Sequence, residues 1–199
     1  MNMNTKERIL EISLQVFNTR GLRNTSTRHI ATEIGISAGN LHYHFKHTED
    51  IIQALFDRLI KESDMLMASL ENYVEGVDME LVFTIFKDFY NLLTRYQFIF
   101  INFVEISLWI PSIRESYAAI VIKRKKETKR FFNLMVQKKV LRNDIPEEVW
   151  DYLINNIFIV VDFWPSHNLI NEKLEGLQAY ESYVSSIKAL MYPYFTHPQ

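Results

Sequence analysis

Side chains that can form hydrogen bonds gather in residues 35–47, which read GISAGNLHYHFKH. Asn40 carries an amide, Tyr43 a phenol, His44 an imidazole and Lys46 an ammonium group. The chain has no cysteine, and it places no serine, histidine and carboxylate together at a spacing that would activate a nucleophile. The set is therefore suited to binding a polar or anionic partner, and we expect neither enzyme activity nor a cofactor.

Two short helices would position these side chains. Leu41 and Phe45 are four residues apart, so they would share the inner face of a helix over 37–44. Gly35 allows a tight turn before this helix, and the Ser37 hydroxyl can cap its free amides. Another short helix comes before the turn. Two short helices joined by a glycine-containing turn are the signature of a helix-turn-helix.

A helix-turn-helix of this kind can bind DNA, with the first turn of its second helix against base edges in the major groove. Asn40 stands in that turn, and its amide can pair bidentately with adenine. Tyr43, His44 and Lys46 would reach the flanking phosphates. The pattern leaves one alternative open, which is an ordinary helical hairpin exposed to solvent.

The charge distribution favours a DNA-binding head. Residues 1–47 carry six basic and three acidic side chains, a formal net charge of +3, whereas the rest of the chain carries 16 basic and 21 acidic side chains, a net charge of −5. Four of the six histidines also lie in the first 47 residues. A zinc site is a weaker interpretation of these histidines. His42 and His44 diverge on a helix, and no thiol or carboxylate accompanies them at ligand spacing, so we predict no metal.

Residues 5–52, TKERILEISLQVFNTRGLRNTSTRHIATEIGISAGNLHYHFKHTEDII, resemble the DNA-binding domain of TetR-family transcriptional regulators. The shared features occur in order: the Phe17-to-Gly21 segment, Thr-Ser-Thr-Arg followed by Ile-Ala, the Gly-hydrophobic-Ser turn, and Gly-x-Leu-x-Tyr-His-Phe-Lys. The resemblance implies base reading by Ala38, Gly39 and Asn40. It also implies contacts to phosphates or a groove edge by Thr27, Arg28, His42, Tyr43, His44 and Lys46.

Three residues depart from the family pattern. His42 stands where the family usually has tyrosine, and its partial protonation would make DNA binding sensitive to pH. Thr48 replaces a frequent lysine, so one phosphate contact is expected to be missing. Ser13 replaces a small apolar residue, and we expect its hydroxyl to bond back to its own helix.

The remaining sequence is also helical in pattern. Glycine and proline separate runs of helical periodicity, and no run alternates as a strand does. We predict an all-α fold, with a helix-turn-helix DNA-binding domain over 1–47 and a larger helical ligand-binding and dimerisation domain over 48–199. The predicted helices are 5–20, 27–34, 37–44, 48–75, 79–94, 96–109, 112–141, 146–164 and 171–192.

Two further segments indicate where in the cell the protein is located. The polar N-terminus has no signal-peptide pattern, and the apolar stretch 98–111 is too short and too polar to span a bilayer. We therefore expect a soluble cytoplasmic protein without a membrane partner.

Residues 80–165 hold 17 of the 27 aromatic side chains. Such density, in a family that binds small molecules in this domain, indicates a pocket for a flat or apolar guest. The alternative is a plain aromatic core. The predicted pocket residues are Phe86, Tyr90, Phe103, Glu105, Trp109 and Asn155, and Asn102, Asn156 and Asp162 are further polar candidates.

Two other segments are expected to form surfaces of the subunit. The basic run KRKKETKR (123–130) is expected to coat the outer face of a long helix, although a second nucleic-acid patch is conceivable. The last two long helices are apolar enough to form a two-fold four-helix bundle between subunits, and packing within one chain is the alternative. The predicted dimer interface is Trp150, Leu153, Ile157, Val161, Leu177, Tyr180, Val184, Ile187 and Met191.

Together these features predict a homodimeric, DNA-binding transcriptional repressor. Its partners would be a near-palindromic double-stranded operator, a second copy of the chain and an unknown small apolar or aromatic effector that releases the operator. A DNA-bound scaffold that recruits another protein and ignores ligands is the alternative.

Overall fold

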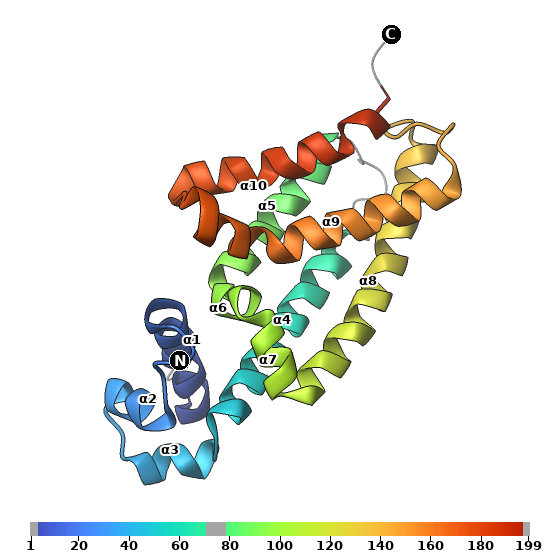
Figure 1. Cartoon of the computed structure of the whole chain (residues 1–199). Coiled ribbons are helices and arrows are strands. Elements are labelled where there is room, and N and C mark those ends of the chain that lie inside the picture. The colour runs from blue at the N-terminus through green and yellow to red at the C-terminus, as the bar shows by residue number, and fades with distance from the viewer. Residues whose placement is uncertain (1–3, 71–78, 197–199) are drawn as a thin grey trace. The chain divides into compact units, whose positions relative to one another are not determined.

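The computed structural model describes residues 4–70 and 79–196, which are mostly helical (Figure 1). The helices are α1 (Thr5–Arg20), α2 (Thr27–Ile34), α3 (Ala38–His44), α4 (Thr48–Leu70), α5 (Met79–Arg95), α6 (Gln97–Ile101), α7 (Phe103–Trp109), α8 (Pro111–Gln137), α9 (Glu147–His167) and α10 (Gly176–Met191). A π-helical turn, Asn168–Glu172, follows α9, and a 3-10 turn, Tyr192–Tyr194, follows α10. In the described part of the chain the one β-type pairing is an isolated bridge from Leu141 to Phe195. The all-α prediction is confirmed.

The chain forms two compact units. Unit 1 contains residues 1–62 and 96–115, and unit 2 contains residues 63–95 and 116–199. Unit 1 therefore holds more than the predicted DNA-binding domain. The start of α4, with α6 and α7, belongs to it, and the ring of Phe17 on α1 stacks on Phe98 of α6 at 4.9 Å between centroids. The predicted boundary after residue 47 remains a proposed division of roles.

Unit 1 is built around apolar side chains spaced three or four residues apart on each helix. At most 1% of the surface of each of four such side chains is exposed: Ile9, Phe17, Ile30 and Leu41. The first turns of α4 add Ile51 and Leu55, which are fully buried. Burying such a side chain stabilises the fold by about 1.5–3 kcal/mol, so this core fixes the three short helices.

Unit 2 has its core where α5, α9 and α10 pack together. The inner face of α10 supplies three fully buried side chains, Tyr183, Ile187 and Met191. The ring of Trp150 on α9 meets Phe132 of α8 edge-on, with centroids 5.7 Å apart. This geometry is favoured between aromatic rings, and it ties α8 to the same core.

One predicted helix is divided. The sequence pattern predicted a single helix over 96–109, but the structure has α6 and α7 with Asn102 between them. The side chain of Asn102 donates a hydrogen bond to the carbonyl of Phe98 at 2.8 Å. An asparagine side chain that bonds to nearby backbone offers the chain an alternative to the helical ladder, and the prediction was wrong there for this reason.

Another predicted helix ends early. The structure ends α8 at Gln137 instead of residue 141. Lys139 has a left-handed backbone, with φ of 60°, and the N–H of Val140 turns back to the carbonyl of Met135 at 2.9 Å. This is the hydrogen bond of a helix C-cap, formed here without a glycine that the sequence could have signalled.

The C-terminal helices also differ from their predicted limits. Helix α9 continues through Pro165 to His167, although the proline ring removes one ladder donor. The predicted helix 171–192 is replaced by the π-helical turn and the shorter α10. The last residues of the predicted helix 48–75, beyond Leu70, lie outside the described residues.

Candidate nucleic-acid interface

Serine side chains cap the two short helices of the helix-turn-helix, as predicted. The Ser37 hydroxyl accepts the backbone N–H of Asn40 at 3.1 Å, and the Ser26 hydroxyl accepts that of His29 at 3.3 Å. Gly35 has a left-handed backbone, with φ of 76° and ψ of 34°, which glycine adopts without strain. Local sequence thus fixes where α2 ends and where α3 begins.

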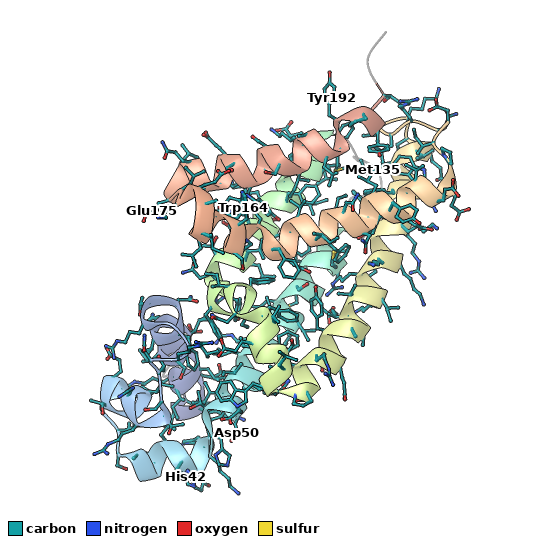
Figure 2. The ribbon with its side chains drawn as sticks, in the orientation of Figure 1. His42, Asp50, Met135, Trp164, Glu175 and Tyr192 are labelled. Atoms are coloured by element: carbon teal, nitrogen blue, oxygen red, sulfur yellow. The ribbon has the colours of Figure 1, made fainter. Side chains whose placement is uncertain are left out.

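Helix α3 has an apolar inner face and a polar outer face. Leu41 and Phe45 are 1% and 5% exposed, which confirms their predicted anchoring role. The Tyr43 side chain is 85% exposed, and its ring meets that of His44 edge-on at 5.2 Å. The other exposed residues of α3 are Ala38, Gly39, Asn40 and His42. Lys46 and His47, which follow the helix, are exposed as well. Figure 2 labels His42.

The start of α2 adds two of the predicted contact residues. Thr27 is partly buried and Arg28 is exposed. The end of α2 is held by Arg8 of α1, whose guanidinium donates to the carbonyl of Ile34 at 2.8 Å. A cation at a helix C-terminus satisfies an unpaired carbonyl and complements the helix dipole, so α2 is fixed against α1.

The outer surface of α3 is free of acidic side chains, because no Asp or Glu occurs between Glu33 and Glu49. Glu33 itself forms an ion pair with Arg20 at 2.6 Å. Within residues 4–70 and 79–196, Arg28 and Lys46 form no ion pair. The positive charges of this surface are therefore not neutralised by the protein, as an anion-binding surface requires.

Gly39 has no structural requirement for glycine. A Cβ placed there would meet one neighbour, the Ser37 hydroxyl at 4.0 Å, and its φ is not positive. Glycine within a helix costs about 1 kcal/mol relative to alanine. Packing therefore does not account for a glycine in the first exposed turn of α3.

One prediction about a single residue in this unit was wrong. Ser13 is fully buried, and its hydroxyl has no hydrogen-bond partner in the described structure, so the expected bond back to α1 is not formed. Among the described residues, no three histidine, cysteine or carboxylate side chains lie close enough to hold a metal ion.

The predicted pocket residues are divided between the two units. Phe103, Glu105 and Trp109 lie on α7 in unit 1, whereas Phe86, Tyr90 and Asn155 lie in unit 2. Glu105 pairs with the Arg23 guanidinium at 3.1 Å, and Trp109 is 45% exposed. The Asn155 amide oxygen accepts from the Lys125 ammonium at 2.8 Å. The pocket remains a prediction, and within unit 2 Tyr90 belongs to an aromatic cluster.

That cluster includes Tyr183, on which the charge of the Asp162 carboxylate acts. The ring of Tyr90 lies 5.3 Å from that of Tyr183, and the Trp164 ring lies 6.0 Å from Tyr90 and 5.5 Å from Tyr183. Asp162 accepts a hydrogen bond from the Tyr117 hydroxyl. Burial raises the pKa of Asp162 to about 6, although the bond from Tyr117 acts in the opposite direction.

Sequence reasoning proposed Asp162 as a polar candidate and missed its tyrosine partners. Tyr117 lies on α8 and Tyr183 on α10, so both are separated from Asp162 by tens of residues in the sequence. Figure 2 labels Trp164 on α9.

The predicted dimer residues divide by burial. Six of the nine are buried within the chain: Trp150, Leu153, Ile157, Val184, Ile187 and Met191. Of the others, Leu177 is 68% exposed, and Val161 and Tyr180 are partly exposed. Large apolar side chains that α9 does leave exposed are Tyr152, Ile159 and Phe163, at 71%, 52% and 44%.

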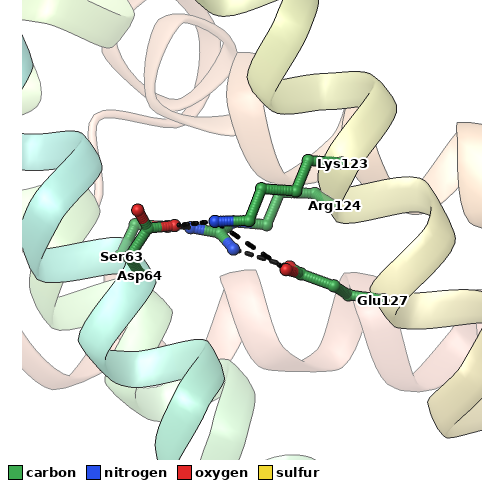
Figure 3. A network of polar contacts seen from close by, with 5 residues as sticks. All are labelled: Ser63, Asp64, Lys123, Arg124 and Glu127. Carbon is green, nitrogen blue, oxygen red and sulfur yellow. Dashed lines mark hydrogen bonds and ion pairs between the residues drawn. The ribbon is translucent and has the colours of Figure 1, made fainter.

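The basic run of α8 is engaged with acidic residues and is only in part a solvated face. Arg124 is 5% exposed, and its guanidinium pairs with Asp64 of α4 and with Glu127 (Figure 3). The ammonium of Lys123 lies 2.8 Å from Asp64. Burial acts to raise the pKa of Asp64, but the hydrogen bonds from Lys123 and Arg124 outweigh it and hold that pKa below its usual value. Here the expectation that the whole run is solvated was wrong for Arg124.

None of the helices in the described residues combines the length and the apolar character needed to cross a bilayer.

Comparison with known proteins covers both units. A family model described as "Bacterial regulatory proteins, tetR family" matches residues 9–55, and one described as "Bacterial transcriptional repressor" matches residues 61–199. A TetR-family transcriptional regulator from Marinobacter aquaeolei has a solved structure with 26% identity and a TM-score of 0.85, covering 98% of this chain and 92% of that one.

Two curated relatives match part of the chain. The uncharacterized regulator YerO of Bacillus subtilis is 34% identical over 71 residues, and the regulator TtgR of Pseudomonas putida is 28% identical over 88 residues. These matches cover 36% and 42% of this chain, and 25% and 42% of the relatives' own lengths. Both family models, in order along one helical chain, decide the assignment. The chain belongs to the TetR family of bacterial transcriptional regulators, which are DNA-binding proteins of the repressor class and not enzymes.

Proposed function

We propose that the protein is a homodimeric repressor that holds a near-palindromic operator and releases it when a small molecule binds unit 2. The observation that carries the proposal is the outer surface of α3. It is exposed, lacks acidic side chains, and has in its first turn a glycine that packing does not require. Such a surface fits the major groove, where protein backbone and short side chains must approach the bases closely.

The contact residues divide into two roles. Ala38, Gly39 and Asn40 lie in the exposed first turn of α3, and the Asn40 amide is the group that distinguishes bases. Thr27, Arg28, His42, Tyr43, His44 and Lys46 contact phosphates or a groove edge. Phosphate contacts set position and salt dependence, whereas base contacts set sequence preference, so the two roles are separable by mutation.

The dimer is assigned to the exposed apolar side of α9. Tyr152, Ile159 and Phe163 are seven and four residues apart, which places them along one side of the helix. Leu177 on α10 adds a fourth exposed apolar side chain, at 68%. Exposed apolar side chains aligned in this way mark an interaction surface, and a second copy of the chain satisfies it by two-fold symmetry.

The effector is assigned to the aromatic cluster of unit 2. A ligand that binds one conformation of the dimer better than another shifts the equilibrium by that difference in affinity. An effector that favours a conformation with a different spacing between the two α3 helices would weaken DNA binding.

Footprinting on an operator recovered by selection from random duplexes tests the proposal. We expect two protected half-sites about one helical turn apart, with a centre-to-centre distance of about 34 Å. A single protected half-site bound by a monomer would contradict the dimeric model.

The alternative, a ligand-independent scaffold, predicts the same footprint. A thermal-shift screen with small molecules separates the two, because an effector raises the melting temperature by mass action. If no compound shifts the melting temperature or releases the operator, the scaffold is favoured.

A further inference from the structure

Asp162 stands among aromatic rings in unit 2. Its carboxylate accepts the Tyr117 hydroxyl, and its charge acts on Tyr183. Tyr90 of α5 links Tyr183 to two more rings, since its centroid lies 6.0 Å from Trp164 and 5.4 Å from Tyr180. Four helices thus place one carboxylate beside a group of electron-rich rings.

Among the residues that the structure describes, no cation pairs with this carboxylate. In the described part of the chain Asp162 forms no ion pair, although the long basic helix α8 supplies its Tyr117 partner. Lys123 and Arg124 of α8 pair with Asp64 instead. Lys125 donates to Asn155, and the Lys129 ammonium lies 2.8 Å from Asp151. A carboxylate held partly buried without a cation destabilises the folded protein, so a binding role explains it better than a structural one.

The Tyr183 hydroxyl is an unpaired polar group in the same cluster. Tyr183 is fully buried, and its hydroxyl oxygen has no hydrogen-bond partner among the described residues. An unpaired buried hydroxyl costs about 1–3 kcal/mol, which a ligand that bonds to it would recover. This observation is independent of the charge on Asp162, and both observations favour a ligand bound at this position.

We propose that Asp162, with Tyr90, Tyr117, Trp164, Tyr180 and Tyr183, recognises a small organic cation that carries N–H donors, such as a primary ammonium or an amidinium. The carboxylate pairs with the cation, the ring faces attract it, and the Tyr183 hydroxyl accepts one N–H. Tyr90, Tyr117 and Tyr180 are partly exposed, so the cluster is open to solvent at its margin. The effector role of this cation rests on the proposed function, but its binding does not.

Other ligand classes fit less well. The pKa of about 6 leaves Asp162 mostly ionised at neutral pH, so an anion is repelled. A neutral ligand could bond to Tyr183 but would leave the charge of Asp162 unpaired. A metal ion lacks ligands, since the described residues offer no group of three histidine, cysteine or carboxylate side chains.

Calorimetric titration of the full-length protein with 2-phenylethylammonium, and with the neutral 2-phenylethanol of similar shape, tests the site. We expect the cation to bind the native protein and the alcohol to bind at least about tenfold more weakly. Asp162→Asn should reduce the affinity for the cation about tenfold or more, and Tyr183→Phe about threefold or more.

Glu148→Gln is the matched control, because it removes an exposed carboxylate from the same helix and should leave binding unchanged. Equal binding of the cation and the alcohol, or no binding of the cation at millimolar concentration, would overturn the proposal. Circular dichroism on each variant verifies that it is folded before titration.

Operator release is measured separately on the same samples. Binding of the cation without release of the operator would contradict the ligand response in the proposed function and leave the cation site standing. Operator binding without any affinity for the cation would contradict the cation site and leave the proposed DNA binding standing.

Discussion

The Ser37 hydroxyl accepts the backbone N–H of Asn40 at 3.1 Å, so the residue assigned to base reading lies in a turn fixed by its own cap. The bond satisfies one of the free amides at the start of α3 and holds Asn40 on the exposed side of the helix. The Asn40 side chain itself is left to reach outward. A short helix with a rigid first turn can place one amide accurately against a base pair.

Replacing Asn40 with alanine should relax sequence preference at one base position per half-site. A bidentate contact of this kind contributes about 1–3 kcal/mol of discrimination, and affinity for random duplexes should change little. Anisotropy titrations against a set of single-base operator variants measure the effect. An equal loss of affinity on every duplex would remove Asn40 from base reading.

Replacing Gly39 with alanine should have opposite effects on stability and on function. The added Cβ meets only open space and the Ser37 hydroxyl at 4.0 Å, so the helix should gain up to about 1 kcal/mol. Operator affinity should fall, because the methyl group would stand between backbone and bases. Urea unfolding and anisotropy on the same preparation measure both, and unchanged operator affinity would show that Gly39 does not face DNA.

Replacing Lys46 with alanine should weaken binding to all duplexes alike. The slope of log affinity against log salt should decrease by about 1, as expected when one phosphate contact is lost. Lys61→Ala is the matched control, since Lys61 is an exposed lysine on α4 outside the proposed interface. The assignment fails if the two variants have the same salt slope.

A glutamate at Ile159 should give a folded monomer with weak operator binding. Ile159 is 52% exposed, so a charge there is tolerated within one chain but not inside an apolar subunit interface. Ile157→Glu is the contrasting variant, because Ile157 is 5% exposed and the charge should unfold unit 2. Sedimentation equilibrium and circular dichroism separate the outcomes, and a dimeric Ile159 variant would refute this interface.

Replacing Asp162 with asparagine should stabilise the ligand-free protein at pH 7. The pKa of Asp162 is raised by burial from 3.8 to about 6, so the folded state holds the charged form less favourably than the unfolded state, by on the order of 3 kcal/mol. The contribution of Asp162 is most favourable below pH 4 and is lost as the pH rises through 6. The stability advantage of the variant should therefore be largest at pH 7 and shrink as the pH falls towards 4. Urea unfolding of both proteins across this range measures the difference, and a gap that widens on acidification contradicts the assignment.

The geometry of α2 and α3 was predictable because its determinants are local. Ser37 caps the helix that it precedes, and Leu41 and Phe45 reveal the inner face by their spacing alone. The lack of acidic side chains around α3 can be counted from the sequence. Each of these features depends on residues within about one or two helical turns.

The larger unit was not predictable to the same depth. Helix α9 is apolar on most sides, so periodicity could not tell the buried Trp150 and Ile157 from the exposed Tyr152 and Phe163. Asp162 meets its tyrosine partners only once four helices have packed. Composition indicated an aromatic domain, but long-range contacts decide which rings share a site.

The most direct measurement of the central claim is a competition experiment with the native protein at about 0.15 M salt, close to physiological ionic strength. A labelled duplex recovered by selection is bound, and unlabelled copies of the same duplex or of random sequence compete for the protein. If the outer surface of α3 reads bases, the selected duplex should compete at least about a thousandfold better than random DNA. Equal competition by both would contradict the claim that this protein recognises a DNA sequence through α3.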